Sequence, residues 1–350
     1  MSEHIEIASA PASAPPQSLQ AFESSSNDSR LIRYYMTVPL PKGGLTLGIL
    51  ALGNLLIAMN VGSPDVVRAV FAGVALLLFI TIIGKCLVHP RIVLSEDMSN
   101  PVVAPVSATV FMSLMQFSTY MAPYGDGAHM LAVSLWYFAV SCNLILMVHV
   151  TSRFIVKGFA LSQVFPTWFV GFVGIVVASA TSSAVGQQPL GLLIFWIGFA
   201  LYMVTFVLVS IRSATIEIPD AAKPSLAIYT APMSLSIAGY TTAEAHPNVY
   251  FVLVMLICAQ LLFAAVLAAM PSLLRVAFSP SYAAFTFPFV ITATALLKSL
   301  NLFAAAGWRV PAWLYVLQGA EAALSCAIVL YVLILFIAHA RRQWRQAGAD

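Results

Sequence analysis

The sequence predicts an all-α polytopic membrane protein with ten transmembrane helices arranged as five helical hairpins. Composition, ten long apolar stretches and a repeat marked by proline predict it. Of the 350 residues, 61% are hydrophobic and 8% are charged, whereas soluble domains carry about 25% charged residues. A soluble globular domain is therefore excluded, and the net charge of +3 gives no support for a nucleic-acid partner.

The two ends of the chain differ in composition from the apolar middle. The N-terminal segment carries Pro11, Pro15, Pro16 and the run Ser24-Ser25-Ser26, with few large apolar residues. Such a segment cannot bury enough surface to offset its ordering entropy. We therefore predict a disordered cytoplasmic N-terminal tail over residues 1–37, a ten-helix transmembrane channel domain over 38–340, and a cytoplasmic C-terminal tail over 341–350.

Ten apolar stretches, each close to the length of a membrane span of about 20 residues, follow one another in the middle of the chain. They cover approximately residues 43–60, 66–88, 102–122, 128–150, 164–185, 190–211, 225–242, 248–270, 282–305 and 312–339. Turn residues and charges separate them, as in Gly62-Ser63-Pro64-Asp65. The stretches are twice as long as a transmembrane strand requires and do not alternate, so helices are predicted.

The basic residues predict the orientation of these spans. An even number of spans places both termini on one side, and thirteen lysines and arginines fall on that side against three on the other. Cytoplasmic loops carry such an excess of positive charge. We therefore expect a multi-pass protein with both termini in the cytoplasm.

Proline marks a repeat of about sixty residues. Pro105, Pro166, Pro232 and Pro288 lie inside or in the first turns of the odd-numbered spans, and Pro41 leads into the first. The even-numbered spans carry Pro189 and Pro311 only at their starts. The five marks are 64, 61, 66 and 56 residues apart, which predicts one helical hairpin per repeat.

The odd and even spans also differ in side-chain size. The odd spans are rich in small and hydroxyl residues, as in Ser179-Ala180-Thr181-Ser182-Ser183, and the even spans in bulky ones. A proline inside a helix frees a carbonyl that a cavity or a neighbouring helix can satisfy and lipid cannot. We therefore predict an inner ring of five odd helices around a central pore, kinked at the four prolines. The alternative is that these residues permit tight helix packing.

Two short motifs resemble a known family. Pro39-Leu40-Pro41-Lys42-Gly43, before Leu47-Gly48-Ile49, and Phe285-Thr286-Phe287-Pro288 resemble the TehA tellurite-resistance proteins, relatives of the slow-type anion channels of plant guard cells. The resemblance implies a homotrimer in the bacterial inner membrane with one pore in each subunit, through which small inorganic anions pass. It places the phenylalanine that plugs the pore at Phe287. Ala283 departs from the pattern, because relatives often carry tryptophan there.

Lys298 and Glu321 are the two ionisable residues well inside the predicted spans. Such residues are costly to insert and are functional candidates. Lys298 follows Phe287 by eleven residues, which places it about 20° off the same helical face. Either Lys298 attracts anions to an outer vestibule, or it pairs with Glu321 between the ninth and tenth helices. The pair is slightly favoured, because an unpaired Glu321 facing lipid would be costly.

The sequence contains no pattern that predicts catalysis. The four cysteines are far apart, and the histidines form no HExxH motif, so no enzyme, cofactor or metal site is predicted. We predict a passive, gated channel for small monovalent anions in the lipid bilayer. The alternative is a secondary carrier or exporter of tellurite-like oxyanions or dicarboxylates.

Overall fold

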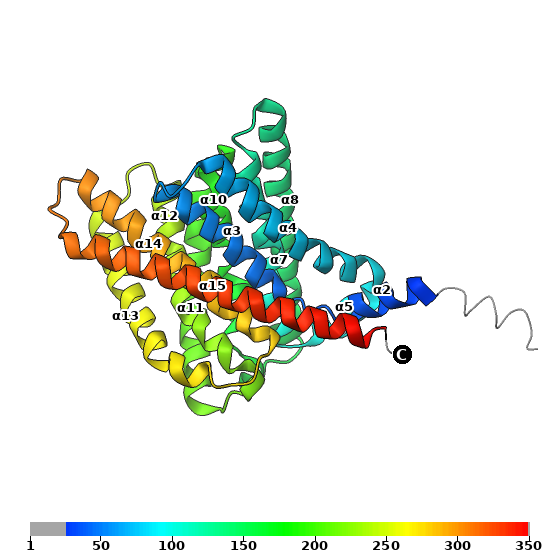
Figure 1. Ribbon diagram of the computed structural model, residues 1–350. Helices are drawn as coiled ribbons and strands as arrows, with labels where there is room; N and C mark the ends of the chain where they lie inside the picture. Colours follow the sequence, from blue (N-terminus) through cyan, green and yellow to red (C-terminus); the bar gives the residue numbers. More distant parts are fainter. Residues whose placement is uncertain (1–25, 349–350) are drawn as a thin grey trace, which may run out of the picture.

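The computed structural model describes residues 26–348 (Figure 1). Over this part of the chain the regular elements are helices and no strand occurs, so the predicted all-α class is confirmed. Five helices are long and pack on the outside, and we call them the outer helices. They are α4 (Pro64–Val88), α8 (Asp126–Thr151), α11 (Gln188–Thr215), α13 (Val249–Leu273) and α15 (Ala312–Gln346).

Five shorter helices, which we call the ring helices, alternate with the outer helices along the chain. They are α3 (Lys42–Ala58), α7 (Ala108–Met121), α10 (Val176–Thr181), α12 (Ala231–Ala243) and α14 (Thr286–Ala305). Short helical segments lead into four of them: α6 (Val103–Val106), α9 (Thr167–Val173), η5 (Asp220–Thr230) and η6 (Pro280–Phe285). The remaining elements are α2 (Ser26–Thr37), α5 (Pro90–Ser95), η1 (Asp97–Ser99), η2 (Ser152–Val156), η3 (Leu161–Gln163) and η4 (Ser182–Val185).

The ring helices contact one another in a closed order. Helix α3 packs against α7 and α14, α10 packs against α7 and α12, and α12 packs against α14. Each outer helix packs against the ring helix that precedes it in the sequence. Neighbours along the chain are therefore neighbours in space.

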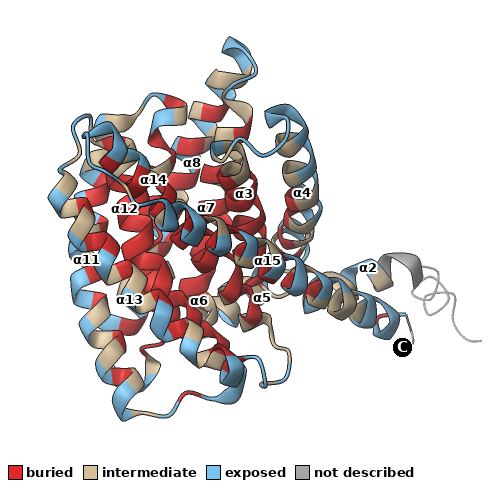
Figure 2. Ribbon diagram, turned by 60° about the vertical axis from the view of Figure 1, so that its left-hand side comes forward, coloured by how far each residue is buried: buried red, intermediate tan, exposed pale blue. Residues whose placement is uncertain are grey.

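Burial separates the two sets of helices. Most residues of α3, α12 and α14 are buried, and Figure 2 shows that the buried residues gather at the centre of the molecule. The outer helices expose large apolar side chains, including Leu77 at 71%, Ile145 at 69% and Val316 at 72%. Such an apolar surface suits contact with the hydrocarbon core of a bilayer, and the helical backbone of these segments satisfies its own hydrogen bonds there.

The described residues contain six helices long and apolar enough to span a membrane, or nine if three bent pairs each count as one span. This establishes a multi-pass membrane protein. The predicted span at 225–242 is formed by the end of η5 and by α12, which has 13 residues. The count of ten spans therefore stays a prediction.

The predicted terminal tails need correction. Residues 26–37, predicted to be disordered, form helix α2, and α15 continues to Gln346, past the predicted boundary at 340. The two segments pack against each other. The Arg30 guanidinium stacks on the Trp344 ring, with 4.4 Å between the guanidinium carbon and the ring centroid. Residues 1–25 and 349–350 lie outside the described part of the chain.

The four prolines lie at helix starts. Pro105 is inside the four-residue α6, Pro166 directly precedes α9, Pro232 is the second residue of α12, and Pro288 is the third residue of α14. A first-turn proline lacks an N–H that the helix does not use.

Two features of the proline pattern differ from the expectation. The fifth apolar stretch bends by 58° between α9 and α10, at Gly174 and Ile175 and not at Pro166. Pro271 lies inside the outer helix α13, although prolines of the even helices were expected only at their starts. Helix α13 extends to Leu273, so Pro271 belongs to its last turn.

Candidate functional site

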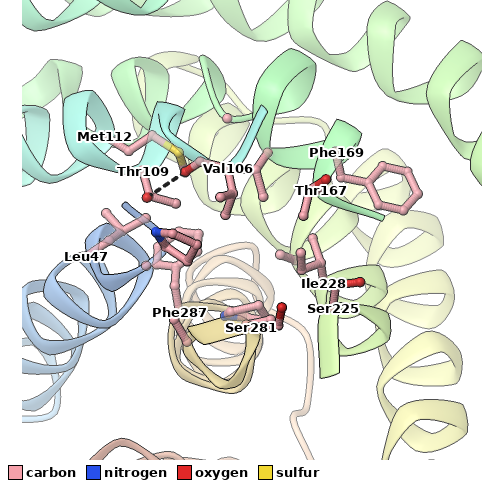
Figure 3. Close-up of a pocket in the computed structure, with 18 of the residues that line it drawn as sticks. Leu47, Val106, Thr109, Met112, Thr167, Phe169, Ser225, Ile228, Ser281 and Phe287 are labelled. Carbon is pink, nitrogen blue, oxygen red and sulfur yellow. Dashed lines mark hydrogen bonds between the residues drawn. The ribbon is translucent and has the colours of Figure 1, made fainter. Parts of the chain in front are cut away.

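A cavity lies inside the ring, at the level where the ring helices begin. Its volume is about 50 Å³, enough for a few water molecules. The lining residues belong to the ring helices, to their leading segments and to the adjoining turns. Figure 3 labels Leu47, Val106, Thr109, Met112, Thr167, Phe169, Ser225, Ile228, Ser281 and Phe287 among them.

The lining of the cavity is uncharged and mostly apolar. Four hydroxyl residues contribute to it: Thr109, Thr167, Ser225 and Ser281. The Thr109 hydroxyl donates to the carbonyl of Val106 at 2.7 Å (Figure 3). The hydroxyls of Thr167 and Ser225 are buried and have no hydrogen-bond partner within the described residues. Because a buried hydroxyl without a partner is costly, these two groups can donate to a molecule or ion that enters.

Most other hydroxyls of the ring helices are already used by the backbone. Ser236 donates to the Pro232 carbonyl at 2.8 Å, and Thr294 donates to the Val290 carbonyl at 2.8 Å. Although the sequence of the odd helices is rich in hydroxyl residues, the cavity is therefore mostly apolar and has few available donors.

Phe287 is the phenylalanine of its motif that reaches the cavity. It lies in the first turn of α14 and is 5% exposed. The neighbouring rings pack elsewhere: Phe285 contacts Tyr282 with 5.4 Å between ring centroids, and Phe289 contacts Phe263 at 5.2 Å. Of these three rings, only that of Phe287 lines the cavity.

Close contact between α3 and α14 fixes the position of Phe287. The Thr286 hydroxyl donates to the carbonyls of Gly44 at 2.9 Å and Ala283 at 2.7 Å. A Cβ on Gly48 would lie 2.9 Å from the backbone nitrogen of Phe287, closer than real Cβ contacts. Only glycine at position 48 allows the two backbones to approach this far.

Polar side chains lie at the far ends of the ring helices, beyond Phe287. Thr294, Lys298 and Asn301 lie on one face of α14 and are not buried, unlike most of this helix. The Lys298 ammonium donates to the Thr242 hydroxyl of α12 at 2.8 Å. Between the ring helices α3 and α7, Asn54 donates to Gln116 at 2.8 Å.

The structure does not bring Lys298 and Glu321 together. No ion pair within 4.0 Å joins them in the described part of the chain. Glu321 lies on α15 at 3% exposure, and neither carboxyl oxygen has a hydrogen-bond partner there. The Gln260 side chain of α13 faces it, also without a partner for its amide nitrogen.

The described residues contain no candidate cluster of metal ligands. Between residues 26 and 348, no group of three His, Cys, Asp or Glu side chains is placed to hold a metal ion. The four cysteines are free thiols, and each is only half-buried.

Several lining residues were missed by reasoning from the sequence. Val102, Val106, Thr109 and Met112 enter the cavity from one side, and their spacing of four, three and three residues is that of one helical face. Ser225 and Ser281 lie in the segments that lead into α12 and α14. Of the four predicted prolines, Pro232 and Pro288 line the cavity.

Comparison with known proteins assigns most of the chain to one family. The model of one protein family, SLAC1 (voltage-dependent anion channel), matches residues 43–340. None of the curated proteins matches the chain. The matched region begins at the second residue of α3 and ends in α15, so it contains nearly all of the ring and outer helices and every lining residue of the cavity except Pro41. The chain belongs to the SLAC1 family of voltage-dependent anion channels.

Proposed function

We propose that this chain is a passive, gated channel for small monovalent anions, whose pore runs through the ring helices and is closed by Phe287. The observation that carries the proposal is the uncharged cavity enclosed by the ring, with Phe287 in its wall. The anion channel family implies permeation of small anions. The gate, the ion class and the route are the parts proposed here.

The chemistry of the cavity suits rapid passage of a weakly hydrated anion. The free hydroxyls of Thr167 and Ser225 can donate hydrogen bonds to an anion and replace part of its water shell. A lysine or arginine at this point would hold the anion too strongly, because conduction requires binding that is weak enough for release. The absence of charge from the lining of this cavity therefore favours a channel for monovalent ions.

Phe287 would close the pore by excluding water. A cavity of about 50 Å³ has room for only a few waters, and the Phe287 ring in its wall would interrupt a continuous hydrated path. Narrow apolar constrictions stop ions in this way, by dewetting. Opening would then require the Phe287 side chain to turn aside or α14 to shift against α3.

Lys298 would attract anions on the other side of the gate. Its ammonium is held by Thr242 and has no carboxylate partner within 4.0 Å in the described residues. It lies on the one face of α14 that is not buried. We therefore favour the vestibule interpretation of Lys298 over an ion pair with Glu321.

The membrane arrangement follows the same proposal. The ten predicted spans would form five hairpins, with the outer helices facing lipid and both termini in the cytoplasm of a bacterial cell. The excess of basic residues on the side of the termini supports this orientation. The resemblance to the tellurite-resistance proteins supports a homotrimer in the inner membrane, with one pore in each subunit.

One observation supports a second candidate function, a secondary carrier of oxyanions or dicarboxylates. The Glu321 carboxyl group is buried without a cationic partner among the described residues, and intramembrane carboxylates often carry protons in transporters. A carrier would use protonation of Glu321 to couple the movement of the substrate.

Electrical recording separates the two candidates. The full chain, reconstituted in planar bilayers with chloride or nitrate, is expected to give a small current, larger in Phe287→Ala, that rises linearly with voltage and needs no counter-ion. Saturable flux that depends on a proton gradient, and that is lost in the variant Glu321→Gln, would contradict the channel and support the carrier.

A further inference from the structure

The two ends of the described chain form one structure at the membrane surface. Helix α2 lies beside the last turns of α15 in Figures 1 and 2. The Arg30 guanidinium donates to the Trp344 carbonyl at 3.1 Å, and the Gln343 amide donates to the Thr37 carbonyl at 2.9 Å. The rings of Tyr34 and Trp344 meet edge to face, with 5.4 Å between centroids. These contacts hold α2 against α15.

The geometry of both helices places this junction where the bilayer meets water. Helix α15 has 35 residues, and at about 1.5 Å per residue it is longer than the roughly 30 Å of hydrocarbon that a span must cross. Helix α2 turns by 77° from α3, so it runs along the membrane surface if α3 crosses it. Leu31, Ile32 and Met36 of α2 are 44–47% exposed, as in helices that insert an apolar face beside the headgroups.

A groove of about 400 Å³ opens between α2 and α15 at this junction. Tyr34, Ile337, Ala340, Arg341, Trp344 and Arg345 line it, and none of them is acidic. The five α15 residues follow one helical face, with Ile337 nearest the span and Arg345 nearest the end of the helix. The groove therefore has an apolar end toward the hydrocarbon and a basic end toward the water.

We propose that this groove, which we call the terminal groove, binds the phosphate of an anionic phospholipid. Arg341 and Arg345 are one turn apart and both exposed, so their guanidinium groups can hold one phosphate with paired hydrogen bonds. Tyr34 and Trp344 would flank the glycerol region, and Ile337 would contact the start of an acyl chain. Basic clusters beside a span attract anionic lipids, and here an aromatic wall and an apolar floor add a shaped site.

Lipid binding to the purified protein tests this proposal. The full chain in a neutral detergent is titrated with dioleoylphosphatidylglycerol or with dioleoylphosphatidylcholine, and native mass spectrometry measures the fraction that retains a lipid. The double variant R341A/R345A removes the basic end of the groove. The matched control R153A/K157A also removes two exposed basic residues four positions apart, at the end of α8 and η2.

The expected result is retention of the anionic lipid over the neutral one, with binding about tenfold to thirtyfold weaker in R341A/R345A and unchanged in the control. Equal binding of the two lipids by the native chain would overturn the proposal. An equal loss in the control would also overturn it, because attraction would then depend on total charge. If the double variant does not fold, the single variant R345A is compared with R153A, with the same outcomes.

Discussion

Gly48 of α3 lies directly against the backbone of Phe287 of α14. A Cβ at position 48 would be 2.9 Å from the Phe287 nitrogen and 2.7 Å from the Thr286 Cβ. The first turn of α14 is thus set by contact with a neighbouring helix as well as by its own hydrogen bonds. A residue far away in sequence therefore constrains where the ring of Phe287, the proposed gate, lies.

Substitution of Gly48 by alanine should therefore displace the gate. The added methyl group overpacks the contact, which costs about 1–3 kcal/mol of stability, and the first turn of α14 must move. We expect a lower melting temperature together with a measurable leak of anions through the closed channel.

The matched control for this change is Gly73→Ala. A Cβ at Gly73 of α4 would meet nothing within 4 Å, so its melting temperature should not fall and its leak should stay that of the native chain. Equal effects of both substitutions would show that helix flexibility, not the contact with Phe287, is responsible.

Replacement of Thr286 by valine tests the hydrogen bonds beside the gate. The change keeps the shape of the side chain but removes the donor to the carbonyls of Gly44 and Ala283. Loss of one buried hydrogen bond costs about 0.5–1.5 kcal/mol, so the melting temperature should fall. Thr286→Ser retains the donor and should recover most of the loss. A serine variant as unstable as the valine variant would contradict this role.

Loss of the free hydroxyls should reduce permeation once the gate is open. In a background of Phe287→Ala, the variants Ser225→Ala and Thr167→Val each remove one donor to a passing anion. We expect chloride permeability to fall roughly tenfold for a barrier raised by about 1.4 kcal/mol. Ser236→Ala is the control, because its hydroxyl donates to Pro232 and does not line the cavity. If the control falls equally, the hydroxyls of the cavity have no special role.

Charge exchange tests the vestibule at Lys298. Because Lys298 donates to Thr242 and no ion pair among the described residues joins it to Glu321, Lys298→Met in the Phe287→Ala background should lower anion current at low salt. High salt should reduce this difference by screening. The double variant Lys298→Glu, Glu321→Lys should not recover the current. Restored expression and current in that double variant, after loss in either single change, would instead establish the pair.

Much of this architecture could be predicted from the sequence, because a bilayer requires apolar helices of similar length that alternate with polar turns. The even-numbered apolar stretches correspond to the outer helices along most of their length. Phe287 could be singled out by the motif in which it lies. The all-α class and the anion channel family are confirmed. The sequence pattern predicts a helix well where the whole helix lies in one environment, such as lipid.

The remaining features depend on contacts between segments distant in sequence. Helix α2 is held in place by Trp344, more than 300 residues later, which stacks on Arg30. The composition of the N-terminal segment gives no information about a contact partner so far away in sequence. The depth of Lys298 and Glu321 could be estimated, but not that one turns to Thr242 and the other to Gln260. Rotation about a helix axis is decided by neighbouring helices.

The most direct test of the account is anion conductance before and after Phe287→Ala, in planar bilayers with the full chain. The account predicts a rise of roughly tenfold or more, since removal of the ring lowers the barrier by at least about 1.4 kcal/mol. Phe285→Ala, whose ring packs against Tyr282, should stay closed. An unchanged conductance in a folded Phe287→Ala protein, or an equal rise in both variants, would contradict the gate.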